Sequence, residues 1–115
     1  MKRIEVHTKH EHMRPILDAL TKVGVGGLTV TQVRGRGKNE VPVVRGLKGS
    51  AKFVADFNTR NLIYTIVNDD QADAVVDAVL EAVKNNELEA FGKMFITDIV
   101  EAVDLTTGER GIKAL

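Results

Sequence analysis

Glycine and basic residues alternate in one short segment, and this combination can bind an anion. The segment Gly35-Arg36-Gly37-Lys38 places two glycines beside two cations. Glycine lets backbone N–H groups approach phosphate oxygens closely, and lysine or arginine adds positive charge. Such a fragment alone is more often a simple turn, because short motifs match by chance. A second glycine and lysine pair, Gly92-Lys93, strengthens the phosphate interpretation.

Other reactive residue types have ordinary explanations. Three histidines, His7, His10 and His12, lie close in sequence and could ligate a metal. We favour surface roles for them, because histidine serves many purposes besides metal binding. The pair Asp69-Asp70 has the residue type of a catalytic acid and base, but it precedes an apolar helix pattern. Helix capping is therefore the better interpretation of this pair.

The composition excludes several classes of function. Lysine plus arginine and aspartate plus glutamate each count 16, so no net charge attracts the chain to nucleic acid or to an anionic membrane. There is no cysteine, which excludes disulfides, cysteine-based zinc sites and thiol catalysis. Four Phe and one Tyr supply few rings for base stacking. We expect no nucleic-acid partner.

The sequence carries no recognisable membrane or export signal. No stretch approaches the roughly 20 apolar residues of a spanning helix. Residues 1–5 lack the apolar run of a signal peptide. We expect a cytoplasmic protein without direct membrane insertion, and the length of 115 residues predicts a single domain over residues 1–115.

Hydrophobic periodicity predicts the elements that must position the candidate residues. Strands are expected over residues 2–8, 28–34, 62–67 and 94–100, and helices over 12–23 and between a cap at 68–70 and an end at 84–86. From Gly35 to about Leu62 no periodicity is evident. A long irregular segment inside a small domain is usually functional or disordered, so we predict a mobile loop at about 37–58, with a floppy insertion as the alternative.

The order of elements predicts an α+β, ferredoxin-like βαββαβ fold with the long loop between strands two and three. Its helices shield only one face of the sheet. Strand residues that face away, such as Ile63 and Thr65 or their alternates, then need cover from other subunits. Oligomerisation is expected for this reason.

The chain resembles the PII signal-transduction family along nearly its whole length, from Met1 to Leu115. The glycine and threonine segment at 23–33 is the most telling similarity. The segments that carry the resemblance are Met1–Glu5, Leu17–Leu20, Val23–Val33, Gly35–Lys38, Val54–Phe57, Ala90–Phe95 and Thr107–Glu109.

The resemblance implies a non-catalytic regulator that forms a homotrimer and binds an adenine nucleotide (ATP, ADP or AMP) in clefts between subunits. The long loop would dock on a transporter, an enzyme or a regulator. Glycine-lined backbone from two distant stretches would meet across a subunit boundary to hold the anion, and Thr29 of the adjoining subunit would bond the adenine edge. The resemblance assigns nucleotide binding to Thr29, Gly35, Arg36, Gly37, Lys38, Asn39, Arg60, Ala90, Phe91, Gly92 and Lys93.

Two departures from the family concern the phosphates. The family's Gly-Asp-Gly-Lys loop is Ala90-Phe91-Gly92-Lys93 here, and two arginines before the closing motif are replaced by Asp104 and Thr106. Losing two cations weakens polyphosphate binding by a few kcal/mol if both are desolvated, at about 1.5 to 3 kcal/mol for each charged hydrogen bond. Arg36 and Arg110 are candidate substitutes. We expect a site that prefers fewer phosphates, or another nucleotide, over magnesium-ATP.

Other departures concern a second ligand and loop modification. The family's glutamine at the magnesium and 2-oxoglutarate site is Asn39 here, one methylene shorter, so we predict a weak or absent response to 2-oxoglutarate. The family's modified loop tyrosine corresponds to Phe53, which cannot be uridylylated. Ser50 lies near a serine that is phosphorylated in some relatives, and we give this modification little weight.

Two other classes of function stay open. An enzyme of this fold needs a nucleophile, base and orienting group, and we identify none. A metal-tolerance trimer of similar fold is compatible with the three early histidines, but the loop length argues against it.

Overall fold

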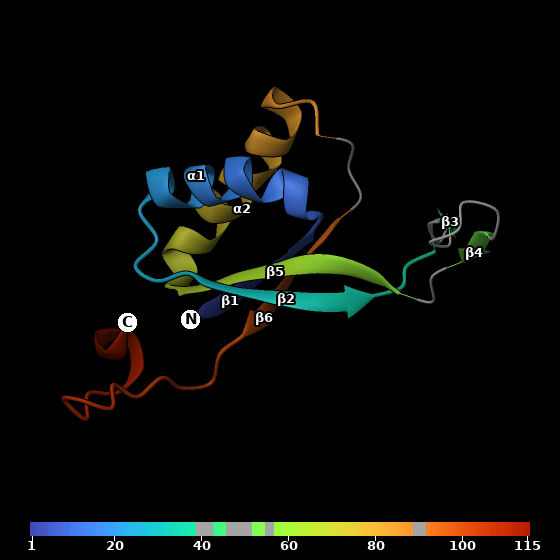
Figure 1. Ribbon diagram of the computed structural model, residues 1–115. Helices are drawn as coiled ribbons and strands as arrows, with labels where there is room; N and C mark the ends of the chain where they lie inside the picture. The colour runs from blue at the N-terminus through green and yellow to red at the C-terminus, as the bar shows by residue number, and fades with distance from the viewer. Residues whose placement is uncertain (39–42, 46–51, 55–56, 89–91) are drawn as a thin grey trace.

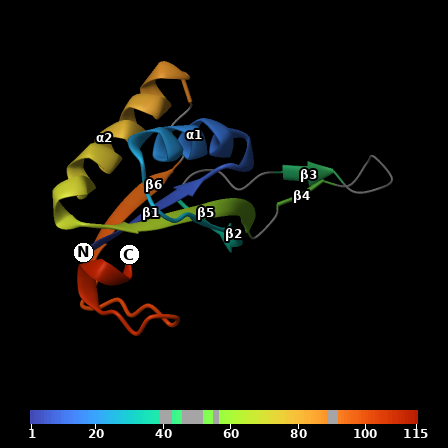
Figure 2. The same cartoon turned by 90° about the vertical axis from the view of Figure 1, so that its left-hand side faces the viewer.

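A computed structural model describes residues 1–38, 43–45, 52–54, 57–88 and 92–115. A four-stranded antiparallel sheet carries two helices on one face (Figures 1 and 2). In chain order the elements are β1 (Lys2–Thr8), η1 (His10–His12), α1 (Met13–Val23), β2 (Thr29–Gly35), β3 (Val43–Arg45), β4 (Lys52–Val54), β5 (Asn58–Val67), α2 (Asp69–Asn85), β6 (Lys93–Asp98) and η2 (Gly111–Ala114).

The strand order of the main sheet is β2-β5-β1-β6, with antiparallel neighbours throughout. Together with the two helices, this order is that of the ferredoxin-like fold, so the predicted α+β class is confirmed. Among the described residues, β3 and β4 pair with each other in a separate two-stranded sheet.

Alternation along the two central strands creates the core. In β1 and β5, every second side chain is buried beneath the helices, including Ile4 at 1% exposure and Ile63 at 0%. α1 ends at Val23 and is followed by the C-cap residue Gly24, whose φ of 87° is left-handed and suits glycine. The core residues are Ile4, Val6, Ile16, Leu20, Ile63, Val67, Ala72, Val75 and Val79.

The other face of the main sheet carries neither α1 nor α2 (Figures 1 and 2). Ile63 and Thr65, named first as residues facing away, in fact lie beneath the helices, with 0% and 2% exposure. Their alternates Leu62, Tyr64 and Ile66 are half-buried and belong to the open face. The sequence could not decide between the two sets, because both are largely apolar.

Several predicted boundaries were wrong by a few residues. β5 begins at Asn58 rather than Leu62. Its first residues are polar and pair with the end of β2, where Gly35 lies opposite Asn58. The pairing supplies backbone hydrogen bonds where no apolar pattern signals a strand. The segment predicted to be irregular also contains β3 and β4. β6 covers Lys93–Asp98, one to two residues earlier than expected.

The predicted cap of α2 is right in position and wrong in detail. Asn68 is the N-cap residue, but its side chain makes no capping bond, and its buried Oδ1 has no partner among the described residues. Asp69 and Asp70 occupy the first turn, where negative charge favours a helix. Asp69 also pairs with the amino group of Met1 at 2.9 Å.

Residues 99–115 follow β6 as an extended arm on the side of the sheet opposite α1 and α2 (Figure 1). A turn closes within it, with Val103 bridged to Arg110 and the Gly108 N–H donating to the Asp104 carbonyl at 2.8 Å. Within the described residues, neither helix combines the length and hydropathy needed to cross a membrane.

Candidate functional site

An open hollow of about 950 Å³ lies at one edge of the main sheet. Antiparallel pairing brings the ends of β1 and β2 and the beginnings of β5 and β6 to this same edge. Segments far apart in sequence therefore border one space. The lining residues are His7, Val33, Arg34, Gly35, Arg36, Gly37, Lys38, Arg60, Gly92, Lys93 and Phe95.

The hollow is strongly basic. Arg34, Arg36, Lys38, Arg60 and Lys93 line it, and none of the described lining residues is acidic. Clustered charge of one sign in a concave site attracts the opposite charge, even when the whole chain is neutral. The arrangement suits an anionic ligand carrying more than one negative charge.

Gly92 is required by a close backbone contact. A Cβ at this position would lie 2.4 Å from the His7 carbonyl oxygen, which no side chain tolerates without movement of the backbone. At Gly35 the nearest atom to such a Cβ is Cδ of Arg60, at an ordinary 3.9 Å. The steric demand for glycine is therefore strong at 92 and weak at 35.

The structure brings seven of the predicted site residues to this hollow: Gly35, Arg36, Gly37, Lys38, Arg60, Gly92 and Lys93. Asn39, Ala90 and Phe91 lie outside the described residues. The two glycine stretches were expected to meet across a subunit boundary, and that expectation was wrong: they border one hollow within a single chain. β5 and β1 lie between β2 and β6 and bring both stretches to the same edge.

Thr29 lies apart from this hollow, at the opposite end of β2. It borders a second depression of about 540 Å³ together with Tyr64, Ile66 and Ile112. Within one chain, Thr29 therefore does not share a site with Gly92 and Lys93. Its predicted role requires a neighbouring subunit.

Asp104 and Arg110 have local structural roles in the C-terminal arm. Asp104 Oδ1 accepts hydrogen bonds from the N–H groups of Thr106 at 2.7 Å and Thr107 at 2.9 Å. These bonds, Thr107 first, hold the pKa of the Asp104 carboxyl below its usual value. Arg110 pairs with Glu101 through two nitrogens, at 2.8 and 3.1 Å. Neither residue lines the basic hollow.

Sequence reasoning missed His7 and Arg34 as neighbours of the predicted site. His7 belongs to a polar network on the open face of β1: its Nε2 lies 2.7 Å from Glu5, and Arg3 contacts the other Glu5 oxygen at 2.7 Å. The hydrogen bond with His7 is the main reason that the pKa of the Glu5 carboxyl is lowered. The available signal was alternation, which places residues 3, 5 and 7 on one face.

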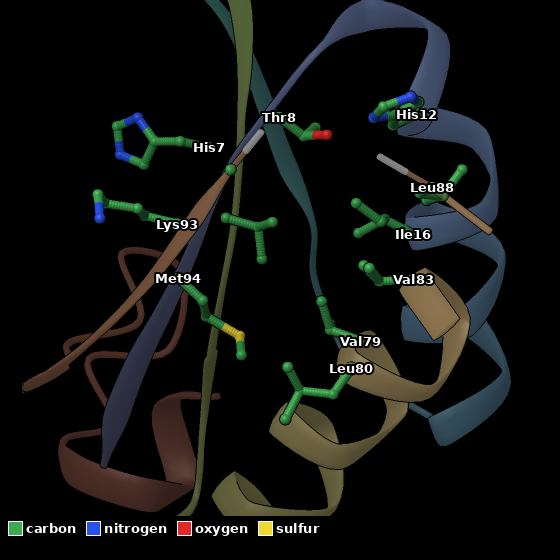
Figure 3. Close-up of a pocket in the computed structure, with 12 residues that line it drawn as sticks. His7, Thr8, His12, Ile16, Val79, Leu80, Val83, Leu88, Lys93 and Met94 are labelled. Carbon is green, nitrogen blue, oxygen red and sulfur yellow. The ribbon is translucent and has the colours of Figure 1, made fainter. Parts of the chain in front are cut away.

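A smaller apolar pocket of about 140 Å³ lies between the sheet and the helices (Figure 3). Ile16 of α1 and Val79 of α2 border it from the helices, and Met94 of β6 borders it from the sheet. His7 and Lys93 lie together on the other side of the strands. No group of three potential ligands that could hold a metal exists among the described residues. His10 instead contacts Asn61, with 3.0 Å between Nδ1 and the amide nitrogen.

The family model and the similar proteins found by comparison all carry the same family description. Residues 1–109 match the model of the family described as nitrogen regulatory protein P-II. A protein of that name from Bradyrhizobium diazoefficiens is 32% identical over 117 residues, and one from Cereibacter sphaeroides is 34% identical, each covering 100% of both chains. The nitrogen regulatory protein P-II 2 of Methanothermobacter thermautotrophicus is 32% identical over 100% of this chain and 97% of its own.

Proposed function

Because this chain belongs to the nitrogen regulatory protein P-II family, we propose that it is a signal-transduction regulator that binds an adenine nucleotide at the basic hollow. As a member of a family of regulatory proteins it is not an enzyme. Ligand binding would change the population of conformations of the segment between β2 and β5. That segment would then bind or release a target protein, such as a transporter or a metabolic enzyme.

One observation carries the proposal. Gly35–Lys38 and Gly92–Lys93, separated by nearly half the chain, border the same hollow with Arg60. Backbone at glycine and nearby guanidinium and ammonium groups together suit phosphate oxygens. A chance turn motif at Gly35 would not account for this convergence.

The open sheet face supports a homotrimer as the working form. Leu62, Tyr64 and Ile66 lie on this face, and Phe95 on β6 is 48% exposed. β1 lies between β5 and β6 and presents Arg3, Glu5 and His7 on the same face, so these apolar side chains flank a charged strip. Apolar side chains grouped on an uncovered sheet face mark an interaction site. In such a trimer Thr29 of one subunit would complete the site of its neighbour at the adenine edge.

The ligand we favour has few phosphates. Asp104 and Thr106 replace two cations of the family pattern, and the Arg110 guanidinium already pairs with Glu101. ADP or AMP would therefore compete well with ATP. Neither magnesium nor 2-oxoglutarate is expected to add much, since Asn39 offers a shorter amide than glutamine. A metal-tolerance role has less support, because His7 and His10 contact Glu5 and Asn61.

Calorimetry with ATP, ADP and AMP tests the proposal. Replacing Lys93 by Ala removes one cation from the hollow, and we expect the affinity for ADP to fall at least about tenfold, since a charged hydrogen bond contributes about 1.5 to 3 kcal/mol. The control is Lys22→Ala, an exposed lysine on α1 outside the hollow, which should leave binding unchanged. Equal loss in both variants, or no binding by the unaltered protein, would contradict the proposal.

A further inference from the structure

His7 borders the basic hollow and contacts a carboxylate at the same time. Its Nε2 lies 2.7 Å from Oε1 of Glu5, and its ring meets the Phe95 ring edge-on, at 88° with 5.4 Å between centroids. Only 29% of the side chain is exposed. Figure 3 shows His7 beside Lys93, on the side of the strands away from α1 and α2. The imidazole is therefore held next to a cation already assigned to ligand binding.

Glu5 determines which ring nitrogen of His7 carries a proton. The pKa of the Glu5 carboxyl is lowered, chiefly by the bond with His7 and also by Arg3, so the group is ionised at neutral pH and can only accept. Nε2 must therefore be the donor in this pair. In the neutral ring Nδ1 is then an acceptor, and no described contact of His7 uses it. Protonation turns Nδ1 into a donor.

Protonation of His7 at Nδ1 adds a hydrogen-bond donor for an anion in the hollow. An acceptor at Nδ1 repels a phosphate oxygen, whereas an imidazolium N–H donates a charge-assisted hydrogen bond to it. Among the described residues, the charged groups around His7 are Arg3 and Glu5 on β1, Lys93 on β6, Arg60 on β5, Arg34 on β2, and Arg36 and Lys38 just after β2. Their residue types ordinarily keep their charge between pH 5 and 8. A second imidazole, that of His12, borders the adjacent apolar pocket with His7.

Building on the nucleotide site proposed above, we propose that His7 is a further binding residue for the phosphate of the ligand, positioned by Glu5 and effective when its imidazole is protonated. The site then has a variable cation in addition to its fixed lysines and arginines. Nucleotide affinity becomes coupled to pH at this one position. The coupling is local, since it requires no change of the fold.

Calorimetry with ADP between pH 5.5 and 8 tests this inference, using the unaltered protein, His7→Gln and His12→Gln. The phosphates of ADP titrate in the same range, so the informative quantity is the ratio of each variant's Kd to that of the unaltered protein at the same pH. For His7→Gln we expect this ratio to rise about tenfold from pH 8 to pH 5.5, the effect of one charge-assisted bond. For His12→Gln, at a position that borders the apolar pocket and not the basic hollow, it should stay constant.

Glu5→Gln separates positioning from a merely structural role. Without the carboxylate the imidazolium loses its stabilising partner, so the pH at which binding strengthens should move downward. A structural defect would instead weaken binding equally at every pH. Should His7→Gln fail to fold, as judged by circular dichroism, the Glu5→Gln profile and an NMR titration of the His7 ring with and without ADP decide the question.

The possible outcomes are distinct. A His7→Gln ratio that does not change with pH overturns the role of His7 while leaving the nucleotide site intact. Inorganic triphosphate serves as a second probe: if it binds with the expected pH dependence and nucleotides do not bind, the adenine assignment fails and the role of His7 stands. A protein that binds neither probe at any pH overturns both proposals.

Discussion

At position 92 the chain enters β6 so close to β1 that a methyl group would collide with the His7 carbonyl oxygen at 2.4 Å. The contact involves backbone on both sides, so it cannot be relieved by rotating a side chain. Gly92 and the adjacent Lys93 also border the basic hollow. A single residue therefore links strand geometry to the shape of the site.

Gly92→Ala is expected to lower the free energy of unfolding by about 1 to 3 kcal/mol, because the strands must separate to admit the methyl group. Urea denaturation measures this change. Gly35→Ala is the matched control, since its added methyl would lie 3.9 Å from Arg60 Cδ. We expect it to change stability by less than about 0.5 kcal/mol. Similar midpoints for the two variants would show that the short contact at 92 is relieved without cost.

Residue types identified part of the site, and register was needed for the rest. Gly35–Lys38 and Gly92–Lys93 stood out because glycine beside a cation has a direct chemical use. His7 did not, since a histidine on a short strand has many possible roles. Its position next to Lys93 follows from the pairing of β1 with β6, where the two residues are opposite each other. Sequence alone gives the alternation of a strand but not the neighbour against which it pairs.

At the scale of elements, apolar periodicity was a good guide. β1 was predicted with its observed bounds, and α1 within one residue, because buried positions alternate or recur every three to four residues. The polar beginning of β5 was missed because ladder hydrogen bonds with β2 define it. β3 and β4 were missed for the same reason, because backbone pairing defines them. Each strand contributes only three residues to a separate two-stranded sheet.

The turn at 104–109 makes a prediction about pH. The folded carboxyl of Asp104 has a lowered pKa, so its stabilisation of the turn is complete above the ordinary value near 3.9 and is lost as pH falls through the lower folded value. Hydrogen exchange of the Thr106 and Thr107 amides should therefore be slowed at neutral pH, relative to Asp104→Asn. After correction for intrinsic exchange, this difference should vanish at the acidic end, once the carboxyl is protonated in the folded chain. A difference that persists there would show that the carboxylate does not hold the turn.

For the whole molecule, the open sheet face predicts self-association. Size-exclusion chromatography with light scattering should give three times the mass of one chain. Ile66→Glu places a charge on this face away from the basic hollow and should yield monomers, because association would have to remove the carboxylate from water. Leu80→Glu, on the exposed side of α2 where Leu80 is 56% exposed, should remain trimeric. A monomeric unaltered protein, or equal behaviour of the two variants, would contradict this assignment of the interface.

The connection between β2 and β5 departs from the sheet edge that borders the basic hollow, just beyond the pair Gly35 and Asn58. Lengthening such a connection is inexpensive, at about 0.6 kcal/mol for each doubling. The backbone pairing of β2 with β5 fixes the register of these two strands, whatever the length of the connection. The connection proposed to bind the target can therefore gain or lose residues during evolution while the residues at its base keep their positions.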